Sequence, residues 1–109
     1  MLIIVLFHLM KFILKGPFKK NIYSLMRKIG YSFQRKDEEK SELIFIRPLE
    51  RSGYPRFHVY LKIDNENLIF NLHLDQKRPS YKGSSSHAGE HKGEVVGAEE
   101  KRIKETLKI

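Results

Sequence analysis

The amino-acid sequence predicts an α+β fold, in which an antiparallel sheet of about four strands has an N-terminal and a C-terminal helix packed on one face. Three observations support this prediction. Two neighbouring runs alternate apolar and polar residues, apolar residues recur at helical spacing before and after these runs, and 109 residues suffice for one small domain. The other face of the sheet then carries no helix, and we expect it to be available for a ligand.

The chain opens with an apolar stretch, residues 1–15, that contains Lys11. This stretch is too short to cross a membrane, which takes about 20 apolar residues. Two interpretations remain open: an interfacial anchor that makes weak contact with a membrane surface, or residues outside the working domain, with Met10 as an alternative start. We describe residues 1–15 as an apolar N-terminal extension and residues 16–109 as a single α+β domain.

A helix is predicted after Pro17, because apolar residues recur there at the spacing of one helical face. Gly30 is expected to end this helix, since glycine readily adopts the left-handed conformation that follows many helices. The apolar positions of the predicted helix are Phe18, Ile22, Leu25, Met26 and Ile29.

Two strands are predicted at residues 31–35 and 42–47, where aromatic and β-branched residues gather on either side of a charged turn. Pro48 is expected to end the second strand, because proline cannot donate a ladder hydrogen bond. The simplest register pairs Arg35 with Glu42, Phe33 with Ile44 and Tyr31 with Ile46.

The clearest pattern is a hairpin from Arg56 to Asp75, with its turn at residues 64–67. Apolar residues occupy the odd positions of its first strand and the even positions of its second, so each strand has one buried face. A slip of one residue would pair every buried side chain with an exposed one, and the register is therefore strongly specified. The buried pairs are Ile63 with Leu68, Leu61 with Phe70, Val59 with Leu72, and Phe57 with Leu74.

On the opposite face this register pairs His58 with His73, Tyr60 with Asn71, and Arg56 with Asp75. Directly paired residues have Cβ atoms about 4.5–5.5 Å apart, so His58, His73 and Asp75 form a candidate catalytic or metal site. Two imidazoles and a carboxylate can hold a divalent metal, which would be the cofactor, or act as acid and base on a phosphodiester. Alternatively, the histidines are a polar pair on an exposed face and Asp75 neutralises Arg56.

A flexible basic loop is predicted at residues 76–93, which show no periodicity and are rich in glycine and serine. We expect its side chains to bind phosphates and bases together with those of the open sheet face. The candidate nucleic-acid-binding residues are Arg56, Tyr60, Lys77, Arg78, Tyr81 and Lys82.

Within this loop, residues 87–91 match the H-x-x-E-H pattern of zinc proteases. The match is weak, because the pattern requires a helix and Gly89 lies between the two histidines. A last helix is predicted at residues 94–108, with acidic residues early and lysines late, the order that the helix dipole favours.

The net charge of +8 is unevenly distributed: the first 36 residues contain eight lysines and arginines and no acidic residue. A basic segment without acids indicates a polyanionic partner, either RNA or DNA or an anionic membrane surface. A solvated basic surface is the simpler alternative. The chain has no cysteine, so disulfides, thiolate metal sites and cysteine nucleophiles are excluded, and a cytoplasmic location fits.

Several segments resemble those of a group of small bacterial proteins with no assigned function. They are residues 47–49, 54–58, 72–77, 80–83 and 87–90. The resemblance covers about residues 23–107 and implies a stand-alone bacterial protein, but it implies no activity.

More loosely, residues 25–31 (LMRKIGY), followed by strands and a helix, are similar to HicA-type toxins. These toxins are small ribonucleases with a double-stranded-RNA-binding-like fold. The Gly-Ser-His phrase that opens a strand in those toxins is absent here, and this chain has an extra strand's worth of sequence. No catalytic residue of those toxins is therefore carried over to a position of this chain.

The leading hypothesis is a small basic protein that binds nucleic acid, RNA rather than DNA, through the open sheet face and the loop after it. The second hypothesis is a metal- or histidine-dependent phosphodiesterase or nuclease that uses His58, His73 and Asp75. The third is a protein that associates with a membrane surface through residues 1–15. The sequence leaves the oligomeric state open.

Overall fold

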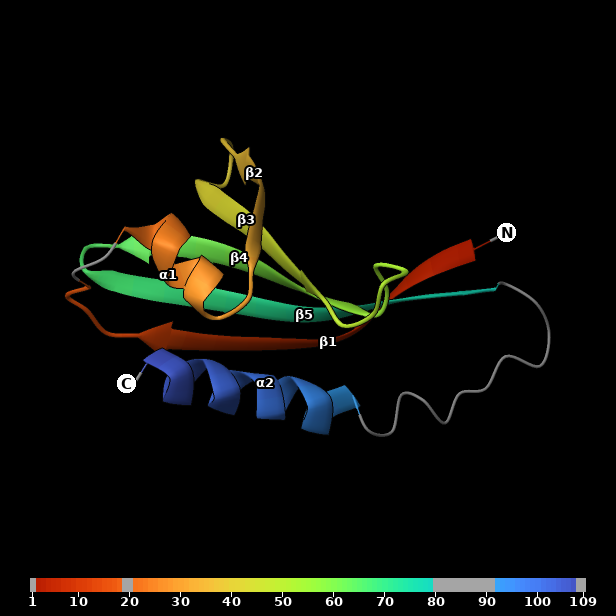
Figure 1. Ribbon diagram of the computed structural model, residues 1–109. Coiled ribbons are helices and arrows are strands. Elements are labelled where there is room, and N and C mark those ends of the chain that lie inside the picture. Colours follow the sequence, from red (N-terminus) through yellow and green to blue (C-terminus); the bar gives the residue numbers. More distant parts are fainter. Residues whose placement is uncertain (1, 19–20, 80–91, 108–109) are drawn as a thin grey trace.

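The computed structural model describes residues 2–18, 21–79 and 92–107. These residues form a five-stranded antiparallel sheet and two helices, arranged as in Figure 1. The strand order is β1-β5-β4-β3-β2, so the first strand lies at one edge of the sheet. The predicted α+β class is confirmed, with one strand more than expected. The elements are β1 (Leu2–Leu14), α1 (Ile22–Lys28), β2 (Ser32–Asp37), β3 (Glu42–Pro48), β4 (Arg56–Asp64), β5 (Asn67–Pro79) and α2 (Lys92–Leu107).

The additional strand is β1, which pairs with β5 along its whole length. Phe12 and Leu14 are buried in the core, and the ring of Phe12 stacks on Phe70 with centroids 4.9 Å apart. The sheet therefore includes residues that the sequence pattern placed in an N-terminal extension, residues 1–15. The alternation of buried Phe12 and Leu14 with exposed Lys11 and Ile13 is short and lies in an almost uniformly apolar stretch.

Helix α1 begins later than its apolar stripe suggests, because Asn21 caps it. The side-chain oxygen of Asn21 accepts a hydrogen bond from the backbone N–H of Ser24 at 2.8 Å. The helix ends at Lys28 with Ile29 as its C-cap, and Gly30 follows with a φ of 93°, as expected for a left-handed glycine after a helix. Phe18 precedes the helix and packs against the core.

The register between β2 and β3 differs from the predicted one, because an irregularity falls between Phe33 and Arg35. Phe33 pairs with Phe45, and Arg35 pairs with Ile44 in place of Glu42. Tyr31 lies before the strand and is buried in the core, so it does not pair with Ile46. The local pattern does not show this, because Tyr31 packs in the core and its hydroxyl donates a hydrogen bond to Glu99 of α2, far away in the sequence.

The register of β4 with β5 is the predicted one, from Arg56 opposite Asp75 to Ile63 opposite Leu68. The apolar face of this hairpin is covered by both helices, with α2 running beside β1 and α1 lying over the β3 and β4 side (Figure 1). Core residues come from every element except β2. They include Leu25, Met26, Ile29, Tyr31, Phe45, Phe57, Val59, Leu61, Leu68, Phe70, Leu72, Leu74, Val96 and Ile103.

Helix α2 is held by a buried carboxylate as well as by apolar packing. The two oxygens of Glu99 accept hydrogen bonds from Tyr31 Oη at 2.7 Å, Arg47 Nη1 at 3.2 Å, and Arg102 Nε and Nη2 at 2.7 and 2.9 Å. Arg102 Nη2 also donates to the carbonyl of Ile29 at the end of α1. These four side chains, the Glu99 cluster, therefore connect α2 with α1 and β3.

The burial of the Tyr31 hydroxyl, reinforced by the charge and the hydrogen bond of Glu99, raises its pKa far above the ordinary value. Tyr31 therefore stays a neutral donor to the carboxylate. In the part of the chain that the structure describes, no helix combines the length and the apolar character needed to cross a membrane.

Candidate nucleic-acid interface

The face of the sheet that the helices leave open, here called the outer face, carries a row of side chains across all five strands. Direct pairing places Lys11, Asn71, Tyr60, Ile44 and Arg35 side by side, from β1 to β2. Neighbouring strands lie about 4.8 Å apart, so the row is about 19 Å long. It has a cation at each end and an aromatic ring at its centre.

Tyr60 lies beside a hollow of about 330 Å³, the outer pocket, which Lys40, Glu42, Asn71 and His73 also line. The ring of His73 meets that of Tyr60 edge to face, with centroids 5.0 Å apart and planes at 83°. On its other side Tyr60 lies nearly parallel to the ring of His58, at 6.0 Å. The pocket thus combines an aromatic wall, an amide, a carboxylate and an ammonium group.

His58 lies between Arg56 and Asp75. Arg56 Nη2 is 3.3 Å from Nε2 of His58, and a guanidinium nitrogen can only donate. Nε2 is therefore the acceptor, and the imidazole is neutral with its proton on Nδ1, which contacts the carboxylate of Asp75. Protonation would have to occur at Nε2, where Arg56 already donates.

Burial, together with the positive charges of Arg56, His73 and Arg35, lowers the pKa of His58 to about 4. The neutral form inferred from the hydrogen-bond geometry is therefore also the one favoured at neutral pH. Burial likewise lowers the pKa of His73, an effect that the nearby carboxylate of Glu42 partly offsets.

Asp75 is buried although it lies on the outer face, with only 4% of its side chain exposed. Arg56 Nε is 3.6 Å from its carboxylate, too far for a hydrogen bond, and the guanidinium rests 4.5 Å from the ring centre of Tyr54. Three buried polar atoms here lack a regular hydrogen bond: Arg56 Nε, His73 Nδ1 and Asp75 Oδ2. Arg56, His58, His73 and Asp75 are called the Asp75 cluster below.

The structure brings together the outer-face residues that the sequence singles out. His58 and His73 are directly paired on one face, as predicted, and Arg56 and Tyr60 lie beside them. Among the described residues no group of three or more histidines and carboxylates is arranged to hold a metal ion, and both ring nitrogens of His58 already have neighbours. The metal and acid–base roles of His58, His73 and Asp75 stay predictions.

The predicted loop at residues 76–93 is described only at its two ends. Its first residues continue β5, where Lys77 and Arg78 pair with Ile4 and Ile3 of β1, and its last residues begin α2. Tyr81, Lys82 and the H-x-x-E-H residues 87–91 lie outside the described residues.

Sequence reasoning did not identify Lys11, Arg35, Lys40 and Glu42 as parts of this face. Lys11 was assigned to an extension, and the predicted β2–β3 register did not pair Arg35 with Ile44. A signal was nevertheless present, because Lys11 and Arg35 both belong to the acid-free first 36 residues.

Comparisons of the chain with protein-family models, with curated proteins and with solved structures find no match.

Proposed function

We propose that this protein binds single-stranded nucleic acid, RNA in preference to DNA, across the outer face of its sheet. The observation that carries the proposal is the outer pocket beside Tyr60, at the centre of a row that ends in Lys11 and Arg35. An aromatic ring on an open sheet face, flanked by cations, is a recurrent platform for unpaired nucleotides.

In this proposal an unstacked base enters the outer pocket and lies against Tyr60. Stacking on an aromatic ring contributes about 1–3 kcal/mol per base and tolerates any base, because each base has a π-face. The amide of Asn71 and the carboxylate of Glu42 line the same pocket and are available to hydrogen-bond to the base edge. Base preference would come from these two groups.

The phosphates would lie along the row, near its cations. Lys11 and Arg35 are exposed at opposite ends of it, and Lys40 lines the pocket between them. Binding through phosphates releases counterions, so affinity falls as the salt concentration rises. For a single strand, each contacted phosphate adds about 0.7 to the slope of log affinity against log salt concentration. The basic, acid-free start of the chain thereby supplies the two ends of the binding row.

The first test measures the anisotropy of a labelled RNA of about 12 nucleotides at several salt concentrations. The double variant Lys11→Ala/Arg35→Ala should lower the salt slope by about 1.4, because two phosphate contacts are lost. Parallel titration with DNA of the same sequence tests the preference for RNA. Absence of binding at low salt, or an unchanged slope in the variant, contradicts the proposal.

The second test concerns stacking. Tyr60→Leu should weaken RNA binding about 5- to 150-fold, because one stacked base is lost, whereas Tyr60→Phe keeps the ring and should bind nearly as wild type. Tyr23→Leu on the helix side is the matched control, since Tyr23 is another partly exposed tyrosine. Equal affinities of Tyr60→Leu and wild type would remove the outer pocket from the binding site.

A further inference from the structure

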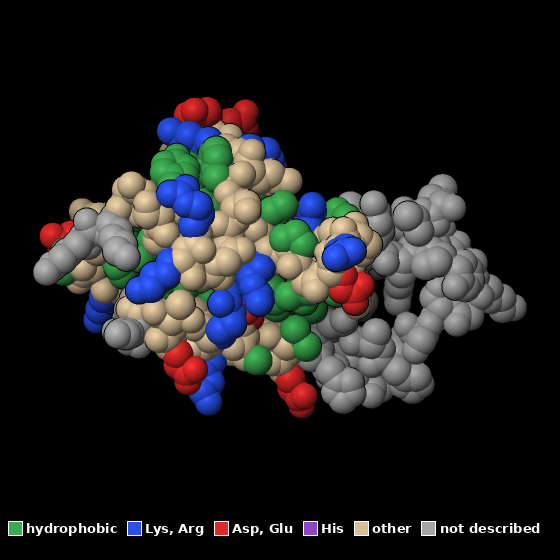
Figure 2. Space-filling view, in the orientation of Figure 1, with side chains coloured by type: hydrophobic (Ala, Val, Ile, Leu, Met, Phe, Trp, Pro, Cys, Tyr) green, Lys and Arg blue, Asp and Glu red, His purple; other side chains and the backbone are tan. Residues whose placement is uncertain are grey.

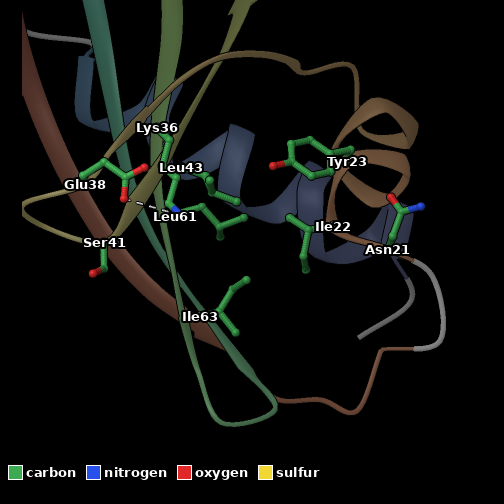
Figure 3. Close-up of a pocket in the computed structure, with 9 residues that line it drawn as sticks. All are labelled: Asn21, Ile22, Tyr23, Lys36, Glu38, Ser41, Leu43, Leu61 and Ile63. Carbon is green, nitrogen blue, oxygen red and sulfur yellow. Dashed lines mark ion pairs between the residues drawn. The ribbon is translucent and has the colours of Figure 1, made fainter.

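A second hollow, of about 570 Å³, lies on the helix side of the sheet, opposite the outer face, and shares no lining residue with the outer pocket. Figure 3 shows it between the start of α1 and the ends of β2, β3 and β4, with side chains from all four elements turned toward it. Leu43 and Leu61 line it from the core face of the sheet, and Leu61 is completely buried. Its volume is in the range of small-molecule sites in proteins.

The rim of this helix-side pocket is apolar and exposed. Ile63 is 51% exposed and Tyr23 is 42% exposed, and both line the hollow. The space-filling view in Figure 2 shows apolar side chains reaching the surface below the charged tip of the β2–β3 hairpin. Adjacent exposed apolar side chains around a hollow are typical of a binding site, whereas single exposed ones need no explanation.

The apolar surface continues beyond this pocket. A neighbouring hollow of about 330 Å³ shares Ile22 and Ile63 with it and extends to Phe18 and Leu68. The two hollows therefore adjoin, with Ile22 and Ile63 in the wall of both, and together they are called the trough. Two adjoining hollows with an apolar wall in common fit a chain-like ligand better than a compact one.

Charged side chains line both hollows: Lys36 and Glu38 line the first, and Glu66 lines the neighbouring one. Lys36 is the only cation among the described residues that line them. The ammonium of Lys36 is 3.7 Å from Glu38, and their side chains are 54% and 81% exposed, so this ion pair is weak and easily exchanged. In Figure 3 the Lys36 ammonium lies between Glu38 and the leucines of the floor. Together with the net charge of +8, this position favours an anionic group beside Lys36.

We propose that the helix-side pocket binds a single-chain amphiphile with a carboxylate head, such as a medium-chain fatty acid. The carboxylate pairs with Lys36 in exchange for Glu38, and the alkyl chain lies against Leu61 and passes Ile63 toward Phe18. Burial of the alkyl chain removes apolar surface from water on both partners, which supplies the driving force. This ligand site is independent of nucleic-acid binding on the outer face.

The test titrates dodecanoate, below its micellar concentration, into the full chain by calorimetry, with the melting temperature as a second readout. Saturable binding with one site and a rise in melting temperature are expected. Ile63→Glu should abolish binding, because it places a carboxylate in the middle of the trough. Ile13→Glu is the matched control: Ile13 is also an isoleucine in a strand, is 52% exposed, and lies on the outer face, so its variant should bind as wild type.

The head group is tested with Lys36→Gln and with dodecanol and dodecylamine. Lys36→Gln should weaken dodecanoate binding about tenfold and leave dodecanol binding unchanged, because only the carboxylate uses the ammonium. No dodecanoate binding, equal losses in Ile63→Glu and Ile13→Glu, or tighter binding of dodecylamine would overturn the proposal. So would a wild-type dimer in solution that Ile63→Glu dissociates, since a second copy would then occupy the trough.

Discussion

The Glu99 cluster and the Asp75 cluster both place a buried carboxylate among arginines, but they differ in how completely the polar atoms are paired. Each oxygen of Glu99 accepts two hydrogen bonds, from Tyr31, Arg47 and Arg102. Asp75 is as deeply buried, yet one of its oxygens has no regular hydrogen bond, and atoms of Arg56 and His73 beside it also lack one. Buried polar atoms in folded proteins are nearly always paired, so unpaired ones call for an explanation.

This difference in hydrogen bonding indicates that the two clusters have different roles. The Glu99 cluster spans α2, β3 and the end of α1, and its complete pairing offsets the cost of burying charge, so its role is to fix the helices on the sheet. The Asp75 cluster lies within two adjacent strands that apolar pairs already hold together. Asp75 Oδ2 contacts Nδ1 of His58, whereas the unpaired Nδ1 of His73 belongs to a residue that lines the outer pocket. We interpret this nitrogen as the group that a ligand would complete.

The largest effect is expected for Glu99→Gln. This change replaces a carboxylate that accepts four hydrogen bonds by an amide with a single acceptor oxygen, and it leaves Arg47 and Arg102 without a counter-charge. We expect a loss of about 3 kcal/mol in the free energy of unfolding, measured by urea denaturation. Glu100→Gln is the control: Glu100 pairs with Lys104 one helical turn away, at a more exposed position, and this change should cost at most about 0.5 kcal/mol. Similar losses for the two variants would show that the Glu99 cluster does not hold α2.

An intermediate effect is expected from pH. The pKa of His58 is about 4 in the folded protein, below its ordinary value of 6.5, so the unfolded chain binds more protons between these values. Stability should therefore fall as pH decreases from about 6.5 to 4, and His73 acts in the same direction. For the partly solvated His58 we expect a contribution of about 2 kcal/mol, obtained from urea denaturation at several pH values.

His58→Gln should reduce this loss, because glutamine does not titrate. Carboxylates that titrate in the same range remain in both proteins, so the difference between variant and wild type reports His58. A stability that rises as pH falls through this range would instead indicate that Asp75 stabilises the imidazolium form, and the neutral imidazole assigned here would be incorrect.

The smallest effect is expected for Asp75→Asn. Its ion pair with Arg56 is long, and asparagine retains an oxygen that can face Nδ1 of His58. We expect a loss of about 1 kcal/mol, well below that of Glu99→Gln, in the same denaturation experiment. A loss as large as that of Glu99→Gln would mean that both clusters stabilise the fold, and the contrast drawn between them would disappear.

Much of the fold follows from local patterns in the sequence. The β4–β5 register could be predicted because a period of two leaves only one pairing that places the eight alternating apolar residues on one face, where all but Ile63 are buried. The same register placed His58 opposite His73 and Tyr60 opposite Asn71. Helix α2 was predicted from the spacing of Val96, Ile103 and Leu107, and these residues do pack on the core.

Other features depend on partners that are distant in the sequence. Strand β1 exists because β5 extends to Pro79 and offers it a long edge, and an apolar run by itself does not distinguish a strand from a surface segment. The irregularity after Phe33 shifts the β2–β3 register, and the sequence of residues 31–47 does not predict it.

The sequence by itself determined the hairpin, its two faces and the pair of histidines, because side chains in a strand alternate and apolar burial selects one register. Only the tertiary structure decided which charges became buried. In the sequence, nothing distinguishes Glu99 from the other acidic residues of its helix. The packing of α2 places it against Tyr31, Arg47 and Arg102. Burial and pairing are properties of the assembled core, since they depend on residues 52 and 68 positions apart in the chain.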